Sequence, residues 1–301
     1  MPLTTYNDIV VPSFMYGTAW KKETTAKCVE MAVEAGFTAI DTANQLRHYN
    51  EALVGESLLS LQNRGIKRES LFIQTKFTSV DGQGNTTPYD AKANLTTQVK
   101  QSMDSSLQHL HTDCVDSYVL HGPYSRNGLG AADWEVWTAI EDLYTQGKTR
   151  MIGVSNVTAE QLSQLCLKAR VKPMMVQNRC YAIVGWDREV RDICNKHNII
   201  YQGFSLLTAN GQYINDRIVQ DIARRLGTGV APVIFSFAMH LGMLPLTGTT
   251  NMEHMRLDLT ALDLKLTDDD VRNIESIAVP MHYALETNTK STVNQLLFWL
   301  T

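Results

Sequence analysis

Short apolar segments alternate with helical patterns along the whole chain, and this alternation is the feature that most constrains the fold. About eight segments, spaced roughly 25–45 residues apart, are each followed by apolar residues at helical spacing. They cover residues 14–17, 37–40, 71–75, 115–120, 150–154, 174–176, 199–203 and 243–246. Largely continuous apolar segments are typical of strands buried on both faces of a parallel sheet. Eight strand–helix units predict an α/β protein with a (β/α)8 TIM barrel.

A doubly wound parallel sheet is the main alternative to the barrel, because it also alternates strands with helices. That fold should carry a glycine-rich dinucleotide-binding turn, GxGxxG, after its first strand. The chain has Gly17-Thr18-Ala19-Trp20 at this point, which does not fit the pattern. No low-complexity linker divides the 301 residues. We therefore expect one barrel domain over residues 1–301, with residues 279–301 as a C-terminal tail.

Composition disfavours several classes of partner. The formal net charge is −4, the sequence pI is about 6.1, and no basic run exceeds two consecutive residues, which argues against nucleic acid and acidic membranes. No stretch reaches the ~18 apolar residues of a membrane span, and the N-terminus lacks a signal-peptide pattern. The five cysteines are scattered and form no CxxC pair, as expected of reduced thiols. We expect a cytoplasmic protein with no metal site and no nucleic-acid or membrane partner.

Polar residues lie where the predicted strands end. The set consists of Asp41, Lys76, His121, Ser155-Asn156, Gln177 and Ser205. Each of them, taken singly, is more simply explained as a solvated or turn-forming residue. The carboxyl ends of parallel strands meet at one rim of a barrel, so we expect these side chains to gather there. Tyr49, in the polar break after Asp41, is expected to join them.

These residue types together suit the reduction of a carbonyl group. A buried lysine near a tyrosine favours the phenolate and should lower the phenol pKa from ~10, and a carboxylate should keep that lysine charged. A neutral histidine can hydrogen-bond a carbonyl oxygen and orient it. The tyrosine would then act as the general acid. Because no side chain donates hydride, the chemistry requires a nicotinamide cofactor.

Several motifs of the chain resemble those of the aldo-keto reductases, over about residues 14–278. GFTAIDTA is similar to the family signature G-[FY]-x-x-[IF]-D-T-A, while DSYVLHGP and FIQTKF resemble its histidine-bearing and lysine-bearing strands. GVSNV and KPMMVQN are similar to its clamp for the nicotinamide carboxamide. The resemblance implies a (β/α)8 barrel without a Rossmann motif, NADPH bound in an extended form across the rim, and a tetrad of Asp, Tyr, Lys and His.

On this chain the resemblance assigns the tetrad to Asp41, Tyr49, Lys76 and His121. Phe204 stands where the family often has a tyrosine that stacks on the nicotinamide ring. The cofactor-binding residues that the resemblance implies are Gly17, Thr18, Asp41, Ser155, Asn156, Gln177, Phe204, Ser205, Leu206, Thr247, Gly248, Thr249 and Arg256. Among them, Ser155, Asn156 and Gln177 would hold the carboxamide.

The position of the tyrosine departs from the family pattern. The family's tyrosine usually stands five residues after the aspartate, where this chain has Leu46. Tyr49-Asn50-Glu51 resembles the family's Y-x-N-E segment, as if two residues had been inserted before it, and this favours Tyr49. Counting back from Asn50 instead places His48 at the position of the tyrosine. His48 therefore stays open as an alternative.

The segment expected near the adenosine 2′-phosphate also departs from the family. The common I-P-K-S sequence is replaced by Leu244-Pro245-Leu246-Thr247, which has no lysine. Arg256 could supply the missing charge, since a guanidinium suits a phosphate. The resemblance implies NADPH as the cofactor, and NADH is not excluded.

The sequence therefore predicts a monomeric, NADPH-dependent reductase of a small aldehyde or ketone. The expected substrate contacts are Trp20, Tyr49 and His121, and further candidates are Phe77, Tyr124, the 78–89 loop and Phe298-Trp299. Two alternatives stay open. One is a cofactor-binding regulatory or partner-binding barrel with little turnover, since a fold does not fix a function. The other is a reductase that acts on C=N or C=C bonds.

Overall fold

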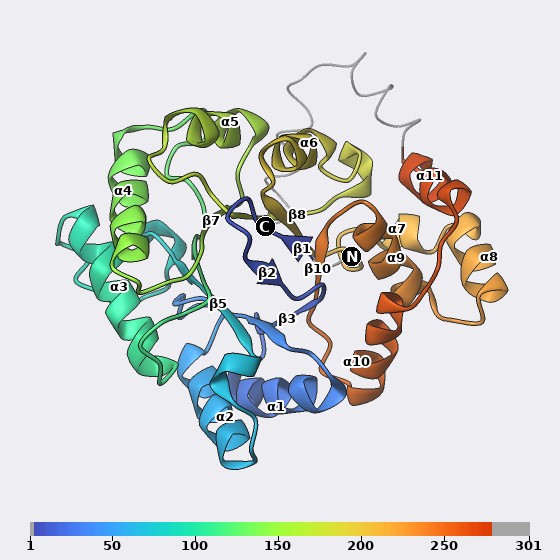
Figure 1. Ribbon diagram of the computed structural model, residues 1–301, viewed down its shortest axis with the longest axis horizontal. Helices are drawn as coiled ribbons and strands as arrows, with labels where there is room; N and C mark the ends of the chain where they lie inside the picture. The colour runs from blue at the N-terminus through green and yellow to red at the C-terminus, as the bar shows by residue number, and fades with distance from the viewer. Residues whose placement is uncertain (1–2, 279–301) are drawn as a thin grey trace.

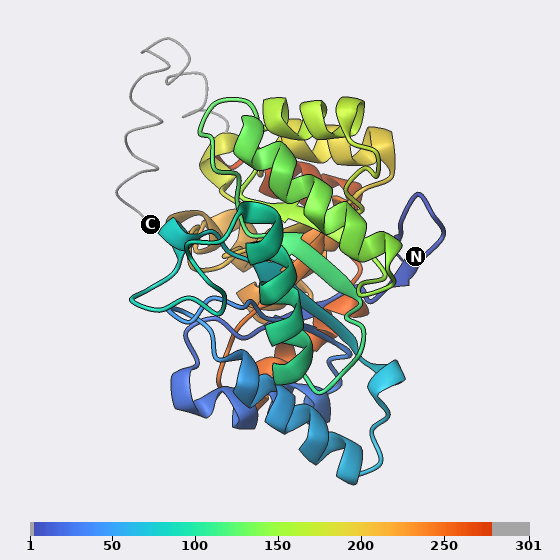
Figure 2. The same cartoon turned by 90° about the vertical axis from the view of Figure 1, so that its left-hand side faces the viewer.

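A closed barrel of eight parallel strands, ringed by helices, forms the centre of the computed structural model, which describes residues 3–278 (Figures 1 and 2). The strands are β3 (Met15–Gly17), β4 (Ala39–Asp41), β5 (Phe72–Phe77), β6 (Ser117–Leu120), β7 (Ile152–Ser155), β8 (Met175–Arg179), β9 (Ile200–Phe204) and β10 (Leu244–Thr247). Around the barrel their order is β10-β3-β4-β5-β6-β7-β8-β9. The predicted (β/α)8 TIM barrel is confirmed.

Helices form the outer layer of the barrel. They are α1 (Thr25–Ala35), α2 (Glu51–Asn63), α3 (Leu95–His109), α4 (Ala131–Thr145), α5 (Ala159–Lys168), α6 (Arg188–His197), α7 (Gly211–Ile214), α8 (Arg217–Arg225), α9 (Val230–His240), α10 (Met252–Leu259) and α11 (Asp268–Ser276). Short 3-10 turns are η1 (Lys22–Thr24), η2 (Arg68–Ser70), η3 (Val80–Gly82), η4 (Ala182–Val184) and η5 (Thr260–Leu262). Within residues 3–278, no helix is both long enough and apolar enough to cross a membrane.

Local sequence fixes where several of these helices begin and end. The side chains of Asn50, Asn94 and Thr158 each accept a hydrogen bond from a main-chain N–H in the first turn of α2, α3 and α5. Gly36 ends α1 with a φ of 121°, a conformation that suits glycine because it lacks a Cβ. The cap at Asn50 follows Tyr49 directly, so the start of α2 fixes the main chain next to the candidate tyrosine.

A short hairpin closes the amino-terminal end of the barrel. Its strands, β1 (Leu3–Thr4) and β2 (Val10–Val11), pair antiparallel and lie across the centre of the ring in Figure 1. Beneath it, the first residues of the barrel strands form an apolar cluster that includes Met15, Ala39, Phe72, Met175, Ile200 and Leu244. Side chains alternate along a strand, so the next inward layer holds Asp41, Gln74, Gln177 and Gln202. The barrel interior therefore changes from apolar to polar toward its carboxyl end.

Two polar residues that were expected to follow their strands lie within them instead. Lys76 does not follow its strand but lies within β5, paired with Val119 of β6. Gln177 lies within β8, paired with Gln202 of β9. Both strands continue past the apolar run because polar side chains that point into the barrel leave the main-chain ladder intact. Asp41 and Ser155, as predicted, are at the ends of their strands.

A buried carboxylate links helices α2 and α3 to the barrel. Glu51, at the start of α2, accepts a hydrogen bond from Thr75 of β5, and its Oε2 lies 3.0 Å from His109 Nδ1 of α3. The hydrogen bond to Glu51 raises the pKa of His109, although burial opposes the rise. The folded protein therefore favours the charged form of His109 more than the unfolded chain does.

The His109–Glu51 contact should make stability depend on pH. A raised folded-state pKa gives a stabilisation that is complete below the unfolded value of about 6.5 and is lost as the pH rises through the folded value. Replacing His109→Asn should therefore cost more stability at pH 5.5 than at pH 9, with a difference of roughly 1 kcal/mol for a partly exposed charged hydrogen bond. Urea midpoints at the two pH values measure this. An equal cost of His109→Asn at both pH values would contradict the prediction.

Candidate active site

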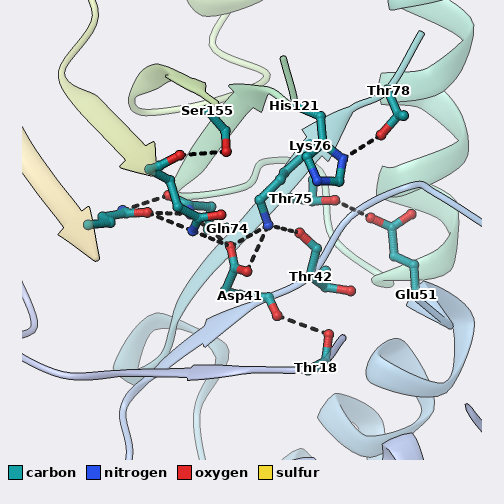
Figure 3. Close-up of polar contacts among 12 residues, drawn as sticks. Thr18, Asp41, Thr42, Glu51, Gln74, Thr75, Lys76, Thr78, His121 and Ser155 are labelled. Carbon is teal, nitrogen blue, oxygen red and sulfur yellow. Dashed lines mark hydrogen bonds and ion pairs between the residues drawn. The ribbon is translucent and has the colours of Figure 1, made fainter. Parts of the chain in front are cut away.

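Lys76 and Asp41 form an ion pair inside the barrel, close to its carboxyl-terminal rim (Figure 3). The fully buried Lys76 donates from Nζ to Asp41 Oδ1 (2.6 Å), to Asp41 Oδ2 (2.7 Å) and to the main-chain oxygen of Thr42 (2.8 Å). Burial lowers the pKa of Lys76, and the Asp41 charge acts in the opposite direction. The lysine can remain charged here only because a carboxylate and a carbonyl surround it.

Three buried glutamines, Gln74, Gln177 and Gln202, lie around this pair and are called the glutamine layer below. Asp41 Oδ1 accepts from Gln74 Nε2 (2.8 Å) and from Gln177 Nε2 (3.1 Å). Gln202 Oε1 accepts from Gln74 Nε2 (2.7 Å) and Gln177 Nε2 (2.9 Å), and Gln202 Nε2 donates to Gln74 Oε1 (2.9 Å). Because β5 and β9 are four strands apart in the eight-stranded barrel, Gln74 and Gln202 meet across its interior.

Tyr49 lies beside Lys76 and His121, just before α2. Lys76 Nζ is 5.2 Å from the centroid of the Tyr49 ring, and the His121 ring packs edge-on to it at 6.0 Å between centroids. The alternative residue, His48, stacks on Trp20 with 3.9 Å between centroids, and its main-chain oxygen accepts from the Trp20 N–H (2.7 Å). The fold therefore brings together the four residues of the expected tetrad, while His48 contacts Trp20.

The 78–89 loop holds the segment that carries Tyr49. Gln83 donates to the main-chain oxygen of Asn44 (2.8 Å) and accepts from the Leu46 N–H (3.2 Å). Gln45 donates in return to the main-chain oxygen of Gly82 (2.8 Å). These contacts fix the 42–50 segment, which is two residues longer than the family pattern implies.

His121 follows β6 and is bound by Thr78, a residue that the sequence did not single out. The two side chains are joined by a hydrogen bond of 2.7 Å between His121 Nδ1 and Thr78 Oγ1. Burial, together with the nearby charges of Lys76 and His48, lowers the pKa of His121 to about 3. The expectation of a neutral imidazole is confirmed.

The expected lowering of the Tyr49 pKa is wrong. Burial raises the pKa of this phenol, and the negative charge of Asp41 raises it further. Lys76 does not offset these effects, because its Nζ lies over the ring and its N–H groups are donated to Asp41 and Thr42. Tyr49 is therefore a protonated phenol at neutral pH in the free protein.

The residues of the predicted carboxamide clamp are adjacent to one another and to His121. Ser155 Oγ donates to the main-chain oxygen of Gln177 (2.6 Å). Asn156 Nδ2 donates to the main-chain oxygen of His121 (2.8 Å) and to Ser155 Oγ (3.2 Å). Asn156 has a φ of 54°, a left-handed conformation that asparagine adopts more readily than most residues. The ends of β6, β7 and β8 are thus hydrogen-bonded into one unit.

The end of β9 places the next three predicted cofactor residues. Phe204 is partly buried, and the guanidinium carbon of Arg179 lies 5.6 Å from its ring centroid. Ser205 follows with a left-handed φ of 57°. The Leu206 side chain is buried in the core that packs around the barrel. Any contact of Leu206 with a cofactor would therefore involve its main chain.

The ends of β3 and β10 lie side by side, as their pairing requires. Thr18 donates from its N–H (3.0 Å) and from Oγ1 (2.9 Å) to the main-chain oxygen of Asp41, which ties the residue after Gly17 to β4. Across the same rim, Lys21 Nζ donates to the main-chain oxygen of Gly248, and Tyr16 donates its hydroxyl to that of Thr249 (2.9 Å).

The residues expected near a 2′-phosphate differ in exposure and in hydrogen bonding. Thr247 Oγ1 donates to Asp258 Oδ2 of α10 (2.8 Å), and burial raises the pKa of Asp258 to about 6. Leu246 is buried in β10, and Arg256 is exposed on α10. Lys21, which the sequence did not single out, brings a second cation to this part of the rim.

A cavity of about 370 Å³ opens beside Tyr49. Its lining is Trp20, Lys22, Glu23, Leu46, Arg47, His48, Tyr49, Asn50 and Leu53. A second cavity of about 540 Å³ is lined by Leu46, Arg47, Gln83, Gly84, Asn85 and Thr86. Leu46 and Arg47 line both cavities, so the lengthened segment forms a wall of each, and neither lining includes Lys76 or His121.

The other residues predicted to contact the substrate differ in how far they are exposed. Trp20, 66% exposed, lines the cavity of about 370 Å³, and its contact with a substrate stays a prediction. Phe77 is wrong as a substrate contact, because it is fully buried and packs on Tyr89 with 5.6 Å between ring centroids. Tyr124 is partly buried and packs on the core, and Phe298-Trp299 lies outside the described residues.

Gln74 and Gln202 are the main residues that sequence reasoning missed. A signal was present: Gln74 stands two residues before Lys76 in FIQTKF, so that the two side chains share a face of the strand. Gln202 likewise interrupts the apolar run IIYQGF. An inward-facing polar residue in a buried strand needs a partner, and that partner could have been sought on another strand.

Comparison with known proteins finds the same likeness over nearly the whole chain. Residues 13–279 match the model of the family described as "Aldo/keto reductase family". A 9,11-endoperoxide prostaglandin H2 reductase of Trypanosoma cruzi is 26% identical over 280 residues, covering 91% of this chain and 90% of that protein. A glyoxal reductase of Bacillus subtilis is 28% identical over 275 residues, covering 90% and 91%.

Solved structures share the fold. An aldo/keto reductase from Brucella melitensis has a TM-score of 0.79 at 25% identity, covering 92% of this chain and 97% of that chain. A Bombyx mori aldo-keto reductase has the same TM-score at 22% identity, covering 92% and 87%, and one of its structures is a complex with NADPH. The second likeness shows the barrel fold alone.

Proposed function

Because the chain belongs to the aldo/keto reductase family, a family of oxidoreductases, we propose that it reduces an aldehyde or ketone with NADPH. The observation that carries the proposal is the contact of Tyr49 with both Lys76 and His121, next to a cavity at the barrel rim. This arrangement places a proton donor, a neutral histidine and a buried cation together. These are the groups needed to protonate a carbonyl oxygen.

The residues present fit a nicotinamide cofactor. Gln177 offers an amide oxygen that accepts no hydrogen bond from residues 3–278, and Phe204 ends the strand next to it with an aromatic side chain. The bound cofactor would supply hydride to the carbonyl carbon. Ser155, Asn156 and Gln177 would hold the carboxamide, and Gly17, Thr18, Ser205, Leu206, Thr247, Gly248, Thr249 and Arg256 are the proposed contacts of the remainder.

The protein's own residues would act on the proton and the substrate oxygen. Tyr49 keeps its proton at neutral pH, so it can donate that proton to the oxygen as the carbonyl is reduced. When Thr78 donates its hydroxyl to His121 Nδ1, the imidazole proton lies on Nε2 and can be donated to the same oxygen. Lys76 brings positive charge to the site where negative charge develops, and Asp41 holds it there.

The wild-type protein provides the direct test. We expect NADPH to bind, seen as a change in its fluorescence, and to be oxidised when aldehydes or ketones are added. Binding without oxidation across aldehydes, ketones and cyclic imines would favour the regulatory alternative, which the displaced tyrosine motivates. Oxidation of NADPH with imines, and not with aldehydes or ketones, would show that the protein reduces C=N bonds. If neither NADPH nor NADH binds, the proposed function is wrong.

A further inference from the structure

The polarity of the glutamine layer is dictated by the charge of Asp41. A side-chain amide can place either its oxygen or its nitrogen toward a neighbour, and the choice follows from the hydrogen-bond network. Asp41 accepts from Lys76 through both of its carboxylate oxygens, and an ionised carboxylate is an acceptor only. The amide atoms of Gln74 and Gln177 that lie 2.8 and 3.1 Å from Oδ1 must therefore be nitrogens.

This choice propagates through the layer. With Nε2 of both glutamines fixed on Asp41, the atom of Gln202 that lies 2.7 and 2.9 Å from these nitrogens must be its oxygen. Gln202 Nε2 then donates to Gln74 Oε1, which completes the set at 2.9 Å. One buried charge thus leaves a single self-consistent orientation for all three amides, and each is held by at least two hydrogen bonds.

Within the glutamine layer, Gln177 Oε1 is the amide atom that takes part in no hydrogen bond with residues 3–278. Both hydrogen bonds from Gln177 Nε2 go to the interior, one to Asp41 and one to Gln202. Oε1 can act only as an acceptor and receives no hydrogen bond from residues 3–278. We propose that Gln202, which Gln74 holds in place through two hydrogen bonds, is a positioning residue that locks Gln177 Oε1 as the acceptor for the amino group of the nicotinamide carboxamide. This inference rests on the proposed function, which places the carboxamide at Gln177.

The need for such a lock follows from the chemistry of the ligand. A carboxamide has a donor end and an acceptor end of nearly the same shape, so a freely rotating glutamine could bind it in either sense. A glutamine with a fixed oxygen selects the sense in which the amino group faces Gln177. An apolar residue in place of Gln202 would leave Gln177 Nε2 with the Asp41 contact alone and would loosen the amide.

Three cofactor forms test the proposal by binding, without turnover. NADP⁺ has the amino group, its thionicotinamide analogue keeps it, and its 3-acetylpyridine analogue replaces it with a methyl group. Dissociation constants from calorimetry should show the wild-type protein binding the first two about 3–10-fold more tightly than the third, which is the size of one hydrogen bond. In Gln202→Met this preference should fall to within about twofold. Gln74→Met should have a smaller effect, because Gln177 Nε2 then keeps its hydrogen bonds to Asp41 and Gln202.

A matched control separates positioning from general destabilisation. Gln98 of α3 is also buried and donates to two main-chain oxygens, but it lies outside the glutamine layer. Gln98→Met should lose stability and keep the wild-type preference among the three cofactors. Melting temperatures and circular dichroism establish that each variant is folded.

The outcomes distinguish this inference from the proposed function. No binding of any cofactor by the wild-type protein would overturn the function. Equal binding of the amino and methyl forms by the wild-type protein would overturn only the inference. An unchanged preference in a folded Gln202→Met protein would also overturn it, since Gln177 would then be held without the layer.

Discussion

Replacing Tyr49→Phe is expected to lower kcat for aldehyde reduction by about 10²–10⁴-fold, the range that a positioned general acid contributes. The change removes one hydroxyl group and keeps the ring that packs on Lys76 and His121. The affinity for NADPH should therefore stay close to that of the wild-type protein. Steady-state kinetics and fluorescence titration of the same preparation measure both quantities.

His48→Gln is the matched control for this result, because His48 is the neighbour that competes for the role. Its ring stacks on Trp20, and burial and the Arg47 charge lower its pKa, so the charged imidazolium that could donate a proton is less populated than in a free histidine. We expect His48→Gln to change KM through the cavity wall and to leave kcat within about tenfold. A large loss in His48→Gln together with an active Tyr49→Phe would assign the general acid to His48.

Replacing Lys76→Met is expected to destabilise the protein by roughly 3–5 kcal/mol, because it leaves the buried Asp41 carboxylate without its cation. The substitution would also remove the positive charge next to Tyr49, so the rate of carbonyl reduction should fall sharply. Urea unfolding followed by tryptophan fluorescence reports the stability change, provided that the transition is cooperative.

A double variant separates the unpaired charge from the lost packing. Asp41→Asn removes the charge, so Lys76→Met/Asp41→Asn should be more stable than Lys76→Met alone, and the two substitutions should not be additive. Breaking the exposed pair Arg224–Asp221 with Arg224→Met should cost no more than about 1 kcal/mol. A single Lys76→Met protein as stable as the double variant would mean that Asp41 is not left charged and buried.

The sequence was sufficient for the barrel and for the places of Asp41, His121 and Ser155 at the strand ends. Eight apolar runs with helices between them can bury their strands only in a layered α/β fold, and the missing glycine-rich turn favoured the barrel over the doubly wound sheet. Asp41, Ser155 and His121 lie where the runs predicted, because a strand end is marked by a local change from apolar to polar residues.

The sequence by itself therefore determined the fold, the rim and the residue types that gather there. The tertiary structure decided which of them touch. Barrel closure, which brings β5 and β9 together across the interior, joins Gln74 to Gln202 over 128 residues of chain. Contacts between the 42–50 and 78–89 loops, absent from any local pattern, turn Tyr49 toward Lys76. The direction of the Tyr49 pKa was decided in the same way, since it is set by burial, which depends on the whole fold, and by the charge of Asp41.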